Sequence, residues 1–189
     1  GLNTPQALAD PEDRFVTLPF AGTDGIDIRY REAGDPNAAR TFVLIHGSVF
    51  NANTWDEVMD DLATRGRVIA YDRLPYGLSE KVQPGDWTES TPMTQEAVTR
   101  RVFQLTDALG VEREVLVGNS FGSVVSVRAA ALAPERVEAL VLGDAAVFVN
   151  ESMPEWLMRL PQVNRLGPLL ARAIGNSESF IKATWADPE

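Results

Sequence analysis

The sequence predicts an α/β fold: a doubly wound, mostly parallel β-sheet covered by helices. Short, unbroken apolar runs alternate with stretches of helical periodicity, which is the order expected of strands joined by helical crossovers. One of those runs leads directly into a turn of small residues and then into a helical stretch. The composition supports a folded core, because 44% of the 189 residues are hydrophobic and 23% are charged.

The first element expected after a polar extension over residues 1–14 is a β-hairpin. Residues 15–18 form a short apolar run, and residues 21–25 contain the glycine and aspartate typical of turns. Apolar and charged side chains then alternate over residues 26–31, which is the period of a strand with one buried and one solvated face. We therefore expect a hairpin at an edge of the sheet, with one face in contact with water.

Further strands are expected to be buried on both faces. Each is a short apolar run without an interrupting polar side chain, the pattern of strands in a parallel sheet that helices cover on both sides. The runs occupy residues 42–45, 68–71, 115–117 and 140–142.

The stretches between these runs have the spacing of amphipathic helices. Apolar residues recur at helical intervals over residues 55–62, and again over residues 98–109 behind a capping threonine. Glycines close both stretches, Gly66 the first and Gly110 the second. A third helix is expected over residues 121–133, where a proline follows.

The alternation of strands and helices stops after the last apolar run. Residues 148–189 contain proline and glycine breaks between short helical stretches and no strand signal. We expect an N-terminal extension over residues 1–14 and a core through the sixth strand over residues 15–147. The remaining residues, 148–189, would then be an incomplete helical segment.

Composition and charge exclude several classes of function. The net charge of −10 disfavours nucleic-acid binding, which requires clustered lysine and arginine. No apolar run is long enough to span a bilayer, and without cysteine the chain has no thiolate metal site or thiol nucleophile. No metal or organic cofactor is expected, since neither a ligand cluster nor a cofactor fingerprint occurs. A cytoplasmic location is expected, because no signal-peptide pattern precedes the first strand.

A G-x-S-x-G motif, Gly118 to Gly122, carries the clearest chemical signal. It lies between a predicted strand and a predicted helix, the context in which this motif forms a nucleophile elbow. Glycines on either side allow a sharp turn that exposes the hydroxyl of Ser120. The spacing of the two glycines and the absence of a following lysine exclude a Walker phosphate-binding loop.

Two further motifs follow the preceding strands. His46-Gly47-Ser48 comes directly after one predicted strand, and residues 71–79, with aspartate, arginine, glycine and serine, follow the next. In this order the three motifs resemble the α/β-hydrolase superfamily, in the branch with a serine nucleophile and a helical cap. The resemblance covers residues 15–146.

The resemblance implies roles for individual residues. Ser120 would be the nucleophile, and the backbone N–H groups of Ser48 and Phe121 would form the oxyanion hole. Glycines of both motifs, Gly47, Gly118 and Gly122, would be structural.

The resemblance also implies a histidine base and a carboxylate that orients it, both after the serine in the chain. The sequence contains one histidine, His46, which precedes Ser120, and the family uses the histidine of its H-G turn to stabilise that turn. We therefore expect the base in a C-terminal remainder of the protein, as a covalent continuation or a second chain. Asp144, after the last predicted strand, is a candidate for the acid; the next strand is the other place where the family carries it.

The function expected from these residues is that of a serine hydrolase that cleaves an ester or related carbonyl compound through an acyl-serine. The substrate would be small and hydrophobic, because apolar residues are frequent in the predicted cap segment. One alternative is a C–C bond hydrolase of ring-cleavage products, although the H-G-S turn here continues without further glycines. The other is a catalytically inactive member of the fold that binds a ligand or a partner protein.

Overall fold

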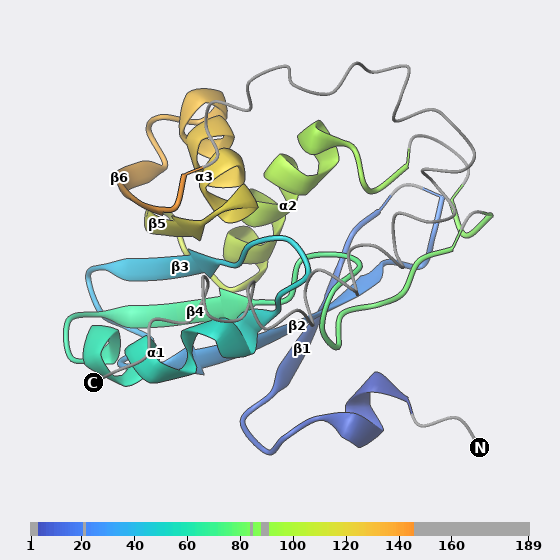
Figure 1. Ribbon diagram of the computed structural model, residues 1–189, viewed down its shortest axis with the longest axis horizontal. Helices are drawn as coiled ribbons and strands as arrows, with labels where there is room; N and C mark the ends of the chain where they lie inside the picture. Colours follow the sequence, from blue (N-terminus) through green and yellow to red (C-terminus); the bar gives the residue numbers. More distant parts are fainter. Residues whose placement is uncertain (1–3, 21, 84, 88–90, 146–189) are drawn as a thin grey trace, which may run out of the picture. The chain divides into compact units, whose positions relative to one another are not determined.

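The computed structural model describes residues 4–20, 22–83, 85–87 and 91–145. Its strands are β1 (Arg14–Leu18), β2 (Ile26–Ala33), β3 (Thr41–Ile45), β4 (Arg67–Tyr71), β5 (Glu114–Asn119) and β6 (Val137–Gly143). They form one sheet in the order β1-β2-β4-β3-β5-β6 (Figure 1). The β1–β2 and β2–β4 pairs are antiparallel, and the pairs from β4 to β6 are parallel. The predicted α/β fold with a mostly parallel sheet is confirmed.

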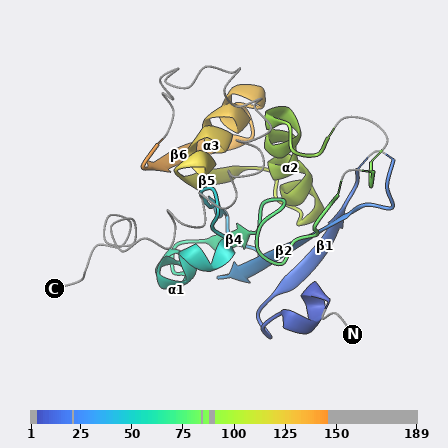
Figure 2. The ribbon, with the colours of Figure 1, turned by 45° about the vertical axis from the view of Figure 1, so that its right-hand side comes forward.

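Helices cover both faces of this sheet. The described helices are the short 3-10 turns η1 (Pro5–Leu8) and η2 (Ala52–Trp55) and the α-helices α1 (Asp56–Ala63), α2 (Gln95–Ala108) and α3 (Phe121–Leu132). The α1 helix lies on one side of the sheet, and α2 and α3 lie together on the other (Figures 1 and 2).

The alternation of side chains along the central strands produces two separate apolar clusters. On β3, Ile45 belongs to the cluster beneath α2 and α3, whereas its neighbour Leu44 belongs to the cluster beneath α1. Every residue of β3 and β4 is buried, as expected for strands covered on both faces.

The ends of α2 are as the sequence predicts. The Thr94 side chain accepts a hydrogen bond of 3.1 Å from the backbone N–H of Ala97. After the helix, Gly110 has a φ of +69°, a conformation that glycine adopts without steric cost.

The prediction of a solvated face on the hairpin is wrong. The hairpin itself is present at an edge of the sheet, as predicted, with β1 as the outermost strand. The charged residues Arg29 and Arg31 of β2, however, are buried. The segment before β1 covers them, because the Asp13 carboxylate accepts hydrogen bonds from both guanidinium groups. Alternating charges here reflect buried ion pairs instead of exposure to water.

The prediction that residues 140–142 are buried on both faces is also wrong for the part of the chain that the structure describes. β6 is the last strand of the sheet, and Leu140, Val141 and Leu142 are 37%, 53% and 38% exposed. Among the described residues no strand pairs with the outer side of β6. An apolar edge of this kind is a site at which a further strand would pair.

The predicted cap over residues 148–189 lies outside the described residues, and the predicted domain boundaries stay predictions. Among the described helices, none is both long and apolar enough to cross a membrane.

A buried carboxylate lies at the start of β5, at the opposite end of that strand from the G-x-S-x-G turn. Glu114 is completely buried, and its oxygens accept no hydrogen bond from any described residue. Arg136 faces it, with Nη2 3.9 Å from Oε2. Burial raises the pKa of Glu114 to about 7, and the positive charge of Arg136 offsets this only in part.

We predict that Glu114→Gln increases the free energy of unfolding at pH 8. Because the native pKa is raised above the unfolded value of 4.5, the protonated form stabilises the fold fully below pH 4.5, and this stability is lost as the pH rises toward 7. Glutamine keeps the shape and removes the charge, so we expect a gain of about 1–3 kcal/mol at pH 8 and little change near pH 4.5. Urea denaturation at both pH values measures the difference. The exposed Glu112→Gln is the control, and an equal effect of Glu114→Gln at both pH values would contradict the prediction.

Candidate active site

The turn between β5 and α3 holds Ser120 in a conformation that non-glycine residues rarely adopt. Its φ is +51° and its ψ is −118°, outside the regions favoured by L-amino acids. The two motif glycines make this turn possible. A Cβ atom on Gly118 would lie 2.5 Å from the Gly122 carbonyl oxygen, and one on Gly122 would lie 1.9 Å from the Ile45 carbonyl oxygen.

Hydrogen bonds to the end of β6 fix this turn. The backbone N–H of Ser120 donates to the Gly143 carbonyl at 2.9 Å. The Ser123 hydroxyl lies 2.9 Å from the Gly118 carbonyl and 3.0 Å from the Gly143 carbonyl, so it connects the two strands. Ser123 was not among the residues predicted from the sequence, although a serine in the first turn of a predicted helix is a signal for such a bond. Its hydroxyl is used by the turn itself, whereas that of Ser120 makes no hydrogen bond to any described residue.

The H-G-S turn after β3 lies directly beside Ser120. A Cβ atom on Gly47 would be 3.2 Å from the Ser120 Cβ and 3.3 Å from the Asn119 Oδ1, so glycine is what allows the two turns to approach. Ser48, the next residue, is exposed. The backbone N–H groups of Ser48 and Phe121 donate to no acceptor among the described residues.

His46 is buried behind this turn with both ring nitrogens engaged. Its Nε2 accepts a hydrogen bond of 2.9 Å from the backbone N–H of Arg73, so the ring proton lies on Nδ1, which donates to the Gly47 carbonyl at 2.7 Å. Burial, reinforced by the positive charge of Arg73, lowers the pKa of His46 to about 3. Neither nitrogen is free to take a proton from Ser120.

Arg73 is a second buried group that contacts the H-G-S turn. Its Nε donates to the His46 carbonyl and its Nη2 to the Gly47 carbonyl, both at 2.9 Å. The guanidinium stacks on two aromatic rings, with its Cζ 5.0 Å from the ring centre of Phe121 and 5.3 Å from that of Tyr76. An arginine inside the 71–79 motif was the available sequence signal, but its direction toward the turn could be seen only in the structure.

Asp72 organises the loops on either side of this end of the sheet. Its carboxylate is completely buried and accepts hydrogen bonds from the backbone N–H groups of Ala52 at 2.7 Å and Leu78 at 2.6 Å. Gly77 has a φ of +56°, and a Cβ atom there would lie 1.9 Å from Asp72 Oδ2. The 71–79 motif therefore forms a compact turn around one carboxylate.

Asp144, the candidate acid, lies one residue beyond the carbonyl that binds Ser120. It has a φ of +43° and an exposed side chain, which makes no hydrogen bond or ion pair to a described residue. The structure thus brings Asp144 to the same edge of the sheet as Ser120, and the described residues place no histidine between them.

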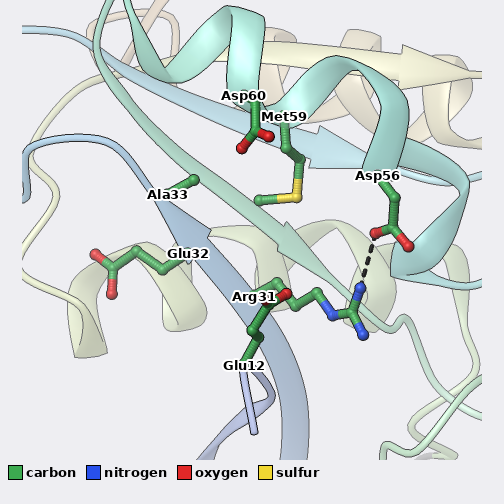
Figure 3. A pocket seen from close by; sticks show the side chains of 7 residues that line it. All are labelled: Glu12, Arg31, Glu32, Ala33, Asp56, Met59 and Asp60. Carbon is green, nitrogen blue, oxygen red and sulfur yellow. Dashed lines mark hydrogen bonds and ion pairs between the residues drawn. The ribbon is translucent and has the colours of Figure 1, made fainter. Parts of the chain in front are cut away.

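A cleft of about 440 Å³ lies elsewhere on the molecule, between α1, β2 and the segment before β1. Figure 3 shows Arg31 reaching from β2 toward Asp56 on α1, to which it donates a hydrogen bond of 2.9 Å. Met59 lies among these charged groups (Figure 3). No predicted site residue lines this cleft.

A family model described as the alpha/beta hydrolase fold matches residues 40–172 of the chain. The chain belongs to the α/β-hydrolase family. It is 31% identical to the dihydrolipoyllysine-residue acetyltransferase component of the acetoin cleaving system of Cupriavidus necator, over 88% of this chain and 43% of that protein. It is 30% identical to the 2-hydroxy-6-oxo-6-(2'-aminophenyl)hexa-2,4-dienoic acid hydrolase of Metapseudomonas resinovorans, over 79% of this chain and 50% of that protein.

A solved structure shows the same similarity in three dimensions. A hydrolase from Pseudomonas aeruginosa is 25% identical and has a TM-score of 0.71, covering 95% of this chain and 64% of that one. The predicted family resemblance is confirmed, and the hydrolase-named matches support a hydrolase. This α/β-hydrolase chain spans about half the length of the two relatives from Cupriavidus necator and Metapseudomonas resinovorans.

We predict that the imidazole of His46 stays neutral from pH 5 to pH 8. Because its native pKa is depressed below the unfolded value of 6.5, the neutral ring stabilises the fold fully above pH 6.5, and this stability is lost as the pH falls toward 3. The assigned Cε1–H resonance of His46, followed by NMR, should keep the shift of the neutral ring throughout. A midpoint near pH 6.5 would show that the ring is accessible to water and could exchange protons with Ser120.

Proposed function

We propose that the protein is a serine hydrolase that cleaves a small ester or related carbonyl compound through an acyl-Ser120 intermediate. The observation that carries this proposal is the strained turn at Ser120, beside two backbone N–H groups without a described acceptor. A positive φ at a serine costs free energy and persists where the surrounding structure requires it. Here its result is a hydroxyl presented at the N-terminus of α3.

The proposed reaction begins with attack of the Ser120 oxygen on the substrate carbonyl carbon. The electron pair of the carbonyl double bond moves to its oxygen, and the Ser48 and Phe121 N–H groups bind the resulting oxyanion. The N-terminal end of α3, with its positive partial charge, adds to this stabilisation. The leaving alcohol takes the proton that the base removed from Ser120, and water then hydrolyses the acyl-serine.

The base in this proposal is a histidine outside these 189 residues, in a continuation of the chain or in a second chain. His46 is the one histidine in the sequence, and its hydrogen bonds and low pKa make it unsuitable as a base. The exposed apolar strand β6 supports the proposal, because an added strand would cover it, and a parallel one would end at the same edge of the sheet as Ser120. Asp144 remains a candidate for the acid that orients this histidine.

A C–C bond hydrolase is the second candidate function. The similarity to the hexa-2,4-dienoic acid hydrolase of Metapseudomonas resinovorans favours it. The same Ser120 and N–H groups would serve such a reaction, so only the preferred substrate distinguishes a C–C bond hydrolase from an esterase. A vinylogous 1,5-diketone of the ring-cleavage type and a simple aryl ester, compared by kcat/KM, provide that test. If neither substrate is turned over, the remaining hypothesis is a catalytically inactive binding protein.

We predict that a fluorophosphonate modifies Ser120 covalently in the intact protein, with any natural continuation of the chain present. Tandem mass spectrometry should find the adduct on Ser120. Ser120→Ala should abolish both labelling and ester hydrolysis, a loss of at least about 10³-fold. The exposed Thr64→Ala is the control and should retain both. Absence of an adduct on Ser120, or hydrolysis unchanged in Ser120→Ala, would contradict the proposed function.

A further inference from the structure

The side chains of His46 and Arg73 hold the peptide bond between Gly47 and Ser48 by hydrogen bonds to its carbonyl oxygen. The Gly47 carbonyl accepts a hydrogen bond of 2.7 Å from His46 Nδ1 and one of 2.9 Å from Arg73 Nη2. In a planar trans peptide the carbonyl and the following N–H point in opposite directions. Fixing the Gly47 carbonyl toward these two donors therefore directs the Ser48 N–H away from them.

The charge of Arg73 is not cancelled by any carboxylate among the described residues. The side chain is 3% exposed, and its hydrogen-bond acceptors are the backbone carbonyls of His46 and Gly47. No described aspartate or glutamate forms an ion pair with it. Burying an unpaired guanidinium is costly, and its field is weakly screened in such surroundings.

Arg73 also contacts the residue that carries the second N–H group. Its Cζ lies 5.0 Å from the ring centre of Phe121, the residue after Ser120. One guanidinium therefore contacts both turns that flank the Ser120 hydroxyl, through a carbonyl on one side and an aromatic ring on the other.

We propose that Arg73 is a positioning residue of the oxyanion hole: it aims the Ser48 N–H and places behind the oxyanion a positive charge that no described carboxylate neutralises. This inference rests on the proposed function, because it assigns a role in that reaction. Arg73 acts on the developing negative charge without contact with the substrate. Its effect should therefore appear in the transition state and be nearly absent from substrate binding.

The chain offers a matched control in Arg101, on α2. Its side chain is 4% exposed, it donates to the Pro92 carbonyl at 3.2 Å, and its Cζ lies 5.8 Å from the ring centre of Phe20. No described carboxylate forms an ion pair with it either. Arg101 is thus a buried guanidinium against an aromatic ring, without an ion-pair partner among the described residues, and it makes no hydrogen bond to the H-G-S turn.

The first experiment compares Arg73→Met, Arg73→Lys and Arg101→Met in the intact protein, with p-nitrophenyl butyrate as substrate. We expect Arg73→Met to lower kcat about a hundredfold with KM within about threefold of the original protein. Arg73→Lys keeps the charge and should recover about tenfold of that loss. Arg101→Met should stay within about threefold in both constants. Affinity for a trifluoromethyl ketone, which forms a charged adduct with serine, should fall in parallel with kcat.

The result that would overturn the inference is a kcat for Arg73→Met within threefold of the original protein, or a change confined to KM. An equal loss in Arg101→Met would also overturn it, since the effect would then belong to buried arginines in general. Circular dichroism identifies any variant that does not fold. If Arg73→Met is unfolded, Arg73→Lys replaces it in the comparison. A kcat and a ketone affinity of Arg73→Lys equal to those of the original protein would then overturn the inference.

A second measurement separates this inference from the proposed function. The carbonyl ¹³C resonance of Gly47 reports the hydrogen bonds it accepts, whether or not Ser120 reacts. We expect it to move upfield in Arg73→Met and to stay in place in Arg101→Met. If the wild-type protein neither reacts with a fluorophosphonate nor hydrolyses esters, the proposed function is wrong. If the Gly47 carbonyl resonance is unchanged in folded Arg73→Met, the positioning role of Arg73 is wrong.

Discussion

The geometry at this end of the sheet depends on how closely the first turn of α3 approaches the end of β3. A Cβ atom on Gly122 would lie 1.9 Å from the Ile45 carbonyl oxygen, so the helix can begin here only because this residue has no side chain. The chain must then reverse within one residue, which forces Ser120 to a positive φ. The same close contact brings the H-G-S turn after β3 beside the serine. One steric constraint thus places the hydroxyl, the start of the helix and the neighbouring turn together.

Buried charges give this edge of the sheet its fixed loops. Asp72 and Arg73 are consecutive in the sequence and have complementary roles: the carboxylate accepts from backbone N–H groups, and the guanidinium donates to backbone carbonyls. Hydrogen bonds to charged groups are stronger than those between neutral groups, which suits loops that must hold backbone atoms in place. The cost is the burial of two charges. His46 completes the arrangement as a neutral ring with both nitrogens engaged.

Much of the fold could be predicted from local patterns, because apolar runs and helical periodicity are properties of short segments. The G-x-S-x-G turn was predictable for the same reason, since its two glycines and flanking elements are all local. What could not be predicted depends on distant partners. The charges of Arg29 and Arg31 indicated an exposed strand, yet Asp13 covers both. The apolar run of β6 indicated burial, but no described strand pairs with its outer side. The direction of the Arg73 side chain depends on two turns that are distant from each other in the sequence.

In the proposed reaction, the strained turn at Ser120 and the H-G-S turn together bind the oxyanion. A crystal structure of the intact protein with a phosphonate bound to Ser120 would show whether they do. We expect one phosphonyl oxygen at about 2.7–3.1 Å from both the Ser48 and the Phe121 backbone nitrogen. A phosphonyl oxygen directed away from both nitrogens, or hydrogen-bonded to another residue instead, would show that the two turns do not form an oxyanion site.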